Sequence, residues 1–182
     1  TYARVLYVTL FSLYFYYKSS GIWFLLLVFT ATSDFCIGRL LSMTTVHWKR
    51  KLLVVVSLCV NLGMLGYFKY TNFLWQVVAG FGQEIGTLFN IPELEQLSYE
   101  PMDIFLPVGI SFFTFQSLSY IIDIYRGRIQ SLKRWIDYVF YVSFFPQLVA
   151  GPIVRARDFI PQIYKNPSVS RAEFGEGLFL II

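Results

Sequence analysis

Charged residues are scarce in this sequence. Only 14% of the 182 positions carry Asp, Glu, Lys or Arg, whereas 56% are hydrophobic and 20% are aromatic. A soluble globular chain has about 25% charged residues, so this scarcity excludes an ordinary soluble domain and indicates a membrane protein. The net charge of +4 comes from short basic clusters between apolar runs. Because these clusters lack the interleaved pattern of a nucleic-acid surface, we expect no nucleic-acid partner and expect membrane lipids instead.

Histidine and cysteine are also nearly missing. The single histidine, His47, lies in the polar stretch "HWKRK", where we expect a solvated or interfacial side chain without a catalytic role. Cys36 and Cys59 lie inside apolar segments with no metal-ligand spacing around them, so we interpret them as buried small hydrophobic residues. The sequence therefore predicts no metal site.

Long apolar runs are what the sequence has in abundance. They cover residues 5–17, 22–41, 52–68, 104–125 and 135–154. A helix that crosses the roughly 30 Å hydrocarbon core needs about 20 residues, so these runs predict an all-α chain with about five transmembrane spans. A further run at "GLFLII" is incomplete, and we therefore expect the chain to be a piece of a longer protein.

Two features of the first runs carry specific expectations. The turn "KSSG" between the first and second runs predicts a helical hairpin. Asp34 lies within the second run, and an ionisable group at membrane depth usually has a partner. Arg39 is a candidate, although five residues are a poor spacing for pairing along one helix face.

The charges that are present alternate in sign along the chain. Residues 42–51 and 126–134 are basic, which predicts that both loops are cytoplasmic, because short loops rich in Lys and Arg stay inside. Residues 76–103 carry acidic side chains, and we expect them outside. The stretch "YTNFLWQVVAGFGQEIGTLF" (70–89) is apolar enough to lie in the membrane interface or to re-enter, but it contains several glycines and no clean span.

The fourth run, "IFLPVGISFFTFQSLSYIIDIY", is polar for a helix that faces lipid. Its polar side chains lie around the whole helix, which predicts a span packed among other helices with bonds across the interfaces. In this interpretation Gln116 bonds to a neighbouring helix, and Asp123 caps the helix or pairs with Arg126.

The stretch "SFFPQLVAGPIVRARDFIPQI" (143–163) is poorly suited to a plain lipid-facing helix. Pro146 and Pro152 each remove a backbone donor, and Gln147 places an amide among apolar side chains. Arg155 and Arg157 follow directly. In one interpretation Pro146 kinks an ordinary span and the arginines anchor it to headgroups. In the other, the backbone leaves helical geometry between Pro146 and Pro152 because it lines a cavity, and Arg155 points into that cavity to hold an anionic group.

Three blocks of this sequence resemble the membrane-bound O-acyltransferase family. They are "NLGMLGYFKYTNF" (61–73), "LPVGISFFTFQSLSYIIDIYRG" (106–127) and "FFPQLVAGPIVRARDFIPQI" (144–163). The pattern is most similar to the bacterial branch that acetylates alginate and other exported polysaccharides. A related branch, which transfers D-alanine to teichoic acids, shares part of the last block.

The resemblance implies a polytopic transmembrane helical protein with broken or re-entrant helices around an intramembrane tunnel. Residues 1–182 would be the N-terminal part of a single acyltransferase domain in the bacterial inner membrane. An activated acyl donor, either acyl-CoA or an acyl carrier, would be presented from the cytoplasm, and a periplasmic or extracellular acetyltransferase could be a partner. The family's essential histidine lies in a later apolar segment, so no catalytic residue is expected in this chain.

The resemblance assigns substrate-binding or tunnel-lining positions only to residues of the two longer blocks. For each of them a structural role in ending or packing helices is the competing interpretation. The candidates are Arg155, Gln147, Gly151, Pro152, Ser111 and Gln116. Broken helices and intramembrane arginines also mark transporters and channels, and a non-catalytic membrane scaffold is a third possibility.

Overall fold

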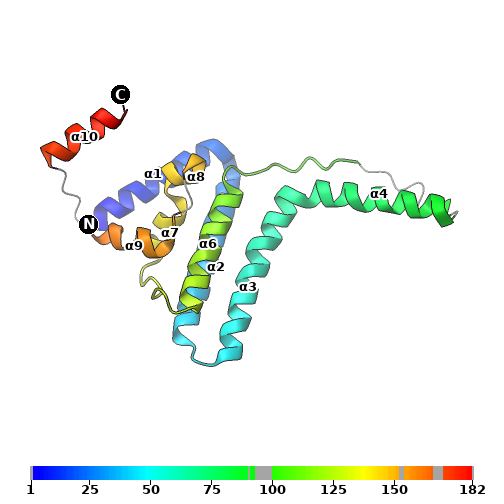
Figure 1. The fold of residues 1–182 in the computed structure, drawn as a ribbon, viewed down its shortest axis with the longest axis horizontal. Helices are drawn as coiled ribbons and strands as arrows, with labels where there is room; N and C mark the ends of the chain where they lie inside the picture. Colours follow the sequence, from blue (N-terminus) through cyan, green and yellow to red (C-terminus); the bar gives the residue numbers. More distant parts are fainter. Residues whose placement is uncertain (1, 90, 93–99, 152–153, 166–169, 182) are drawn as a thin grey trace.

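The computed structural model describes residues 2–89, 91–92, 100–151, 154–165 and 170–181. In these residues the regular structure is entirely helical (Figure 1). The elements are α1 (Tyr2–Ser20), η1 (Gly21–Trp23), α2 (Phe24–Met43), α3 (His47–Leu65), η2 (Gly66–Tyr70), α4 (Thr71–Phe89), α6 (Ile110–Tyr125), α7 (Trp135–Ser143), α8 (Phe145–Ala150), α9 (Ala156–Tyr164) and α10 (Arg171–Ile181).

Two stretches of the described chain are long and apolar enough to cross a membrane. They are Tyr2–Met43 and His47–Phe89. Many of their large apolar side chains are exposed, as expected for helices that face lipid. The cysteines share this exposure. Our interpretation of Cys36 and Cys59 as buried is therefore wrong, because both lie on outward faces of the apolar helices.

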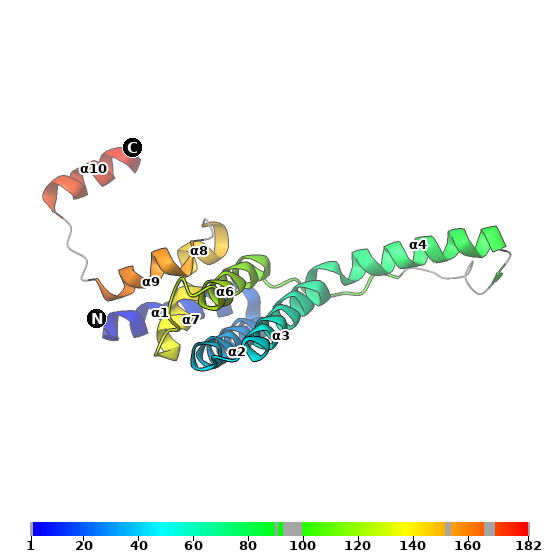
Figure 2. The same ribbon diagram turned by 60° about the horizontal axis from the view of Figure 1, so that its bottom comes forward.

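The core of the molecule forms where α2, α3 and α6 lie side by side (Figures 1 and 2). Gly38 of α2 makes close approach of α6 possible, since a Cβ there would come within 2.9 Å of Tyr120 Cε1. Small residues at such crossings let helices in membranes pack tightly. The Tyr120 hydroxyl in turn accepts a bond from the Leu132 N–H at 2.9 Å, which ties the following loop to the bundle.

Arg50 of α3 joins the C-terminal ends of α2 and α6 in this bundle. Its guanidinium donates to the carbonyls of Leu41 (2.8 Å) and Thr44 (3.2 Å) at the end of α2. It also donates to the carbonyl of Tyr125 (3.0 Å) at the end of α6. A cation at a helix C-terminus satisfies free carbonyls and interacts favourably with the helix dipole. The basic cluster thus has a structural role beyond setting orientation.

The first two helices turn at the predicted place but do not form a closely packed hairpin. The chain reverses at Gly21, whose φ of +57° suits glycine. From there α1 and α2 diverge (Figures 1 and 2), and α1 packs mainly on α7. The reason is that α1 contributes its buried face, including Ser12, to the helices that follow α6.

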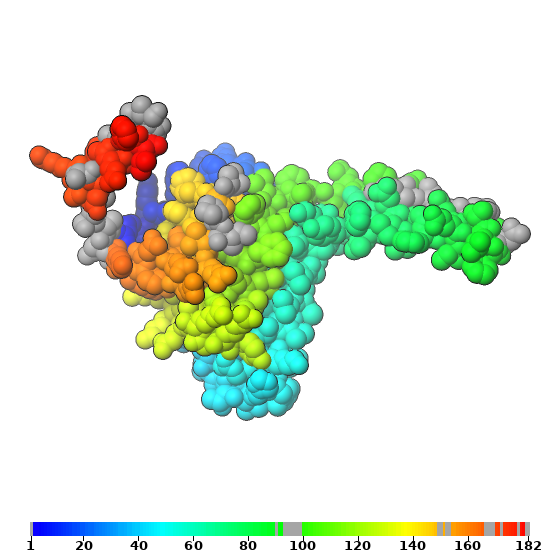
Figure 3. All heavy atoms as spheres, viewed as in Figure 1, coloured from blue at the N-terminus to red at the C-terminus, as the bar shows by residue number. Residues whose placement is uncertain are grey.

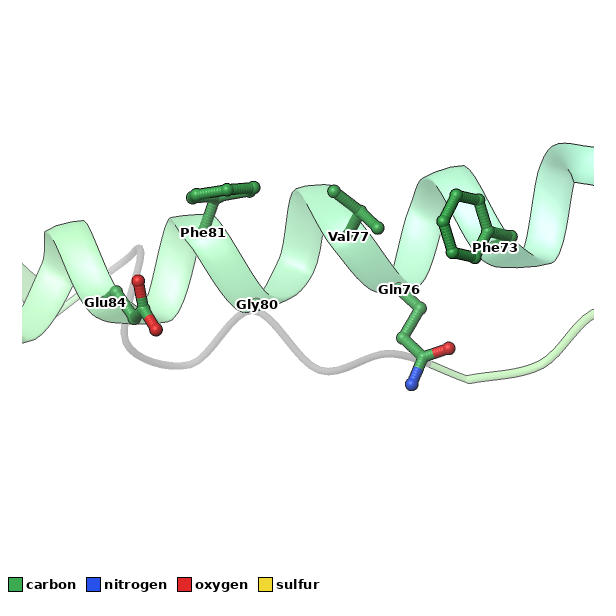
Figure 4. Close-up of a pocket in the computed structure, with 6 residues that line it drawn as sticks. All are labelled: Phe73, Gln76, Val77, Gly80, Phe81 and Glu84. Carbon is green, nitrogen blue, oxygen red and sulfur yellow. The ribbon is translucent and has the colours of Figure 1, made fainter.

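α4 forms an arm that extends from the bundle (Figures 1 and 3). The glycines of this segment do not prevent a continuous helix of 19 residues. A shallow depression on α4 has Phe73, Val77 and Phe81 along one i, i+4 row and Gln76, Gly80 and Glu84 along the next (Figure 4). The arm leaves α3 through the π-helix η2, at a large angle to α3 (Figure 1).

Candidate functional site

The fifth apolar run is broken. α7 ends before Phe144, whose backbone angles (φ −56°, ψ 107°) are not helical, and α8 begins directly after it. Pro146 lies in the first turn of α8, where a missing N–H is tolerated. α8 then ends at Gly151, which is extended (φ −81°, ψ 162°). The fifth run is therefore interrupted at Phe144 and at Gly151, but the residues between these breaks are helical, so the expected non-helical backbone between Pro146 and Pro152 is found only at Gly151 among the described residues. That this backbone faces a cavity stays a prediction.

Side chains from two other helices satisfy the backbone groups that the first break leaves free. In a continuous helix the Tyr141 carbonyl would accept from the Phe145 N–H. Instead, Gln116 Nε2 of α6 donates to the Tyr141 carbonyl at 2.8 Å, and the Phe145 N–H donates to Ser12 Oγ of α1 at 3.4 Å. Gln116 and Ser12 are both buried. The expectation that Gln116 bonds to a neighbouring helix is therefore confirmed.

Two of the predicted site residues meet at this break. Gln116 Nε2 also lies 3.4 Å from Gln147 Oε1, so the amide of α6 contacts both α7 and α8. The Tyr141 hydroxyl donates to the Val154 carbonyl at 3.1 Å and thereby holds the chain beyond the second break against α7. The neutral amide and hydroxyl groups at this break thus bond α6, α7 and the chain beyond α8 to one another.

An aromatic cluster surrounds the first break. Phe144 packs on Phe140 and Phe159, with ring centroids 5.3 and 5.6 Å apart. On its other side Phe145 packs on Phe11 and Phe15 of α1, at 5.4 and 5.6 Å. Aromatic pairs at such distances stabilise beyond the area they bury, by about 0.5–1.5 kcal/mol each. The packing holds the break in one conformation.

Gly109 brings the two longer sequence blocks into contact. It precedes α6 with φ +71°, and a Cβ at this position would lie 2.6 Å from the Leu148 carbonyl oxygen of α8. The start of α6 and the backbone of α8 therefore touch at a point that only glycine fits. The Tyr16 hydroxyl donates to the Val108 carbonyl at 2.8 Å and fixes the same segment from α1.

The remaining candidates lie apart from this contact. Ser111 is on another face of α6, where its hydroxyl lies 3.4 Å from Lys69 Nζ of η2. Arg155 precedes α9 with an extended backbone and is exposed, and among the described residues it has no hydrogen-bond or ion-pair partner for its side chain. Gly151 is half-buried, and a Cβ there would lie 2.5 Å from Gln147 Cα. Pro152 lies outside the described residues.

Asp34 bonds to residues of α3 and not to Arg39. Ser57 Oγ donates to Asp34 Oδ1 at 2.6 Å, and Asn61 Nδ2 donates to Oδ2 at 2.8 Å. All three side chains are buried between α2 and α3. Asp34 therefore has the partners that its position predicts, but they are neutral donors one helical turn apart on α3 and not Arg39.

Two further expectations have clear outcomes. Asp123 pairs with Arg128 (3.5 Å) and not with Arg126, because Gly127 at φ +70° turns the chain back. His47 is exposed at the start of α3, as predicted.

No group of three or more His, Cys, Asp or Glu residues in the described chain lies close enough to hold a metal ion.

Comparison with known proteins rests on sequence identity to curated relatives. No family model and no solved structure matches this chain. It is 40% identical over 128 residues to a probable alginate O-acetylase AlgI of Pseudomonas aeruginosa, covering 68% of this chain and 21% of that protein. It is 30% identical over an alignment of 207 positions to a peptidoglycan O-acetyltransferase of Helicobacter pylori, covering 96% of this chain and 37% of that protein.

The chain belongs to the membrane-bound O-acyltransferase family. It spans between about a fifth and two fifths of the length of these two curated relatives, so it represents one part of such a protein. A third relative, a probable alginate O-acetylase of Pseudomonas fluorescens, is 45% identical over 74 residues, 41% of this chain and 15% of that protein.

Proposed function

We propose that the protein containing this chain transfers an acetyl group across the bacterial inner membrane to hydroxyl groups of an exported polysaccharide. The observation that carries the proposal is the identity to relatives named for O-acetylation of two different polysaccharides, alginate and peptidoglycan. An activated acyl donor, acyl-CoA or an acyl carrier, would supply the acetyl group from the cytoplasm. A periplasmic or extracellular acetyltransferase would be a partner for the last step.

The broken helix supports a specific role for this part of the protein. Backbone that leaves helical geometry at membrane depth is tolerated where it is buried in protein or lines a cavity, and not against lipid. The first break is of the buried kind, since Gln116 and Ser12 bond its free groups and aromatic rings pack on it. The second break, at Gly151, is extended and only half-buried. We infer that α6 and α8 form part of the wall of an intramembrane tunnel, which residues elsewhere in the protein complete.

The experiment uses the full-length protein in proteoliposomes. Labelled acetyl-CoA is supplied on the cytoplasmic side, and acetyl esters are measured on alginate and on peptidoglycan fragments. We expect ester formation on one of the two acceptors by the full-length protein, with or without a periplasmic fraction, and none by residues 1–182 alone. His47→Ala should leave the rate unchanged. Movement of solute without any ester on either acceptor would instead indicate a transporter.

A further inference from the structure

Two adjoining depressions lie where the N-terminal end of α7 meets the start of α1 and the end of α9. One, of about 250 Å³, is lined by Tyr2, Val5, Arg134, Asp137 and Tyr164. The other, of about 330 Å³, is lined by Ser131, Leu132, Lys133, Arg134 and Tyr164. They share Arg134 and Tyr164, and we call them together the Arg134 depression. Each is close to the lower limit of small-molecule sites, which start at about 300 Å³.

The two cations of the Arg134 depression leave their hydrogen-bond donors unused among the described residues. Among the described residues, neither Lys133 nor Arg134 forms a hydrogen bond or an ion pair through its side chain, and both are exposed. The Arg134 guanidinium lies over the Tyr2 ring, 5.6 Å from its centroid. Other arginines are engaged: Arg50 caps two helices, and Arg4 donates to the Ile163 carbonyl at 3.0 Å. The donors of Arg134 are thus free to hold a ligand.

The one acidic group in the lining is already bonded. Asp137 is 1% exposed, and its Oδ2 accepts from the Tyr164 hydroxyl at 2.5 Å. Partial burial, followed by the bond to Asp137, raises the pKa of Tyr164 to about 12, so the hydroxyl keeps its proton at neutral pH. The carboxylate is therefore turned inward, and the exposed rim is basic.

The walls of the depression are fixed by bonds from the bundle. The Leu132 N–H donates to the Tyr120 hydroxyl at 2.9 Å, and Ser131 Oγ lies 2.7 Å from Ser42 Oγ of α2. Arg4 holds the C-terminal end of α9, where Tyr164 lies, by bonds to the carbonyls of Ile163 and Lys165. The depression is consequently part of the folded scaffold.

We propose that the Arg134 depression binds a phosphate ester, with Arg134 and Lys133 on the phosphate and the Tyr2 and Tyr164 rings beside the attached group. The planar guanidinium fork matches two phosphate oxygens, and the lysine adds a second charge. The charge pattern predicts this side to be cytoplasmic, where two sources of the same chemistry occur. One is a soluble phosphate ester such as coenzyme A, and the other is the headgroup of an anionic phospholipid.

The test measures binding to the full-length protein, so it does not depend on the proposed transferase activity. In nanodiscs of phosphatidylcholine, coenzyme A is titrated calorimetrically. In nanodiscs that also contain phosphatidylglycerol, retained lipid is counted by native mass spectrometry. The variant Lys133→Gln/Arg134→Gln should weaken one of the two interactions at least about tenfold, since each lost charge-assisted bond is worth about tenfold or more.

Two matched variants make the result specific. Arg126→Gln removes a charge from the same loop outside the depression and should leave binding unchanged. Arg134→Lys keeps the charge but lacks the guanidinium fork, and it should weaken binding several-fold. This single variant still tests the proposal if the double variant fails to fold. Coenzyme A binding that the double variant weakens identifies a soluble ester, and phosphatidylglycerol retention that the double variant weakens identifies a lipid. Binding of either that the double variant leaves unchanged would place it elsewhere in the protein and overturn the proposal. Absence of both, or equal weakening by Arg126→Gln, would overturn the proposal.

Discussion

Gln116 replaces a backbone donor that the helix break removes. Its amide lies in an apolar helix, 4% exposed, and donates to the Tyr141 carbonyl at 2.8 Å. We expect Gln116→Leu to lower the free energy of unfolding by about 1–3 kcal/mol, because the carbonyl stays buried without a partner. Thermal unfolding of the full-length protein in detergent measures this. Gln130→Leu, an exposed loop glutamine, is the control and should change stability by less than about 0.5 kcal/mol.

The two arginines after the break differ in their partners. Arg157 Nε lies 3.3 Å from Asp158 Oδ1, whereas the Arg155 side chain has no partner among the described residues. If Arg155 holds an anionic part of donor or acceptor, Arg155→Lys loses the guanidinium fork and should lower the acetylation rate about tenfold to a hundredfold. Arg157→Lys should do much less.

The comparison of Arg155 and Arg157 requires matched amounts of folded protein, measured by size-exclusion chromatography of each variant. Rates of acetyl ester formation are then compared in the same membranes. Near wild-type rates in both variants would favour the alternative in which the arginines only anchor the chain to headgroups.

At the scale of elements, the contact between α6 and α8 depends on one glycine. Gly109 has φ +71° and leaves no room for a Cβ against Leu148, whereas Gly127 has φ +70° and nothing within 4 Å. Alanine at either position costs about 1–2 kcal/mol for its left-handed backbone. Gly109→Ala should cost clearly more than Gly127→Ala, since α8 must also move. Their difference in unfolding free energy, measured in detergent, isolates the contact; equal losses would show that α8 does not press on α6.

The break itself could be predicted from sequence because its causes are local. Prolines and glycine in "FFPQLVAGP" remove backbone donors and favour a helix start or end nearby, although Pro161 lies inside α9. The groups that stabilise the break could not be predicted. Ser12 lies 133 residues from Phe145 in sequence, and nothing around it in its apolar run indicates a bond to that residue. Arg50 was likewise assigned only to orientation, since its bonds to α6 cross more than 70 residues. Pairing across helices leaves no periodic trace in the sequence.

At the scale of the whole molecule, the arrangement of charges and helices defines two ends. The loop at 44–46, the Arg50 cap and the loop after α6 lie at one end of the α2–α3–α6 bundle, and η2 and the start of α6 lie at the other (Figure 1). The first end is basic and the second leads into the acidic segment. Residues 93–99 of that segment lie outside the described residues. Only two stretches of the described residues are long and apolar enough to cross a membrane. The expected number of about five spans therefore stays a prediction.

The orientation of these ends can be tested with single cysteines. Cys36 and Cys59 are first replaced by alanine, because both are exposed and would react if reached. Cysteines are then placed at Lys49, Glu84 and Lys133, all exposed side chains. Because basic loops stay inside, an impermeant maleimide added to intact cells should label position 84 and leave 49 and 133 unlabelled until the cells are opened. Labelling of 49 and 133 without 84 in intact cells would invert the topology, and it would place the Arg134 depression on the side where no cytoplasmic phosphate ester reaches it.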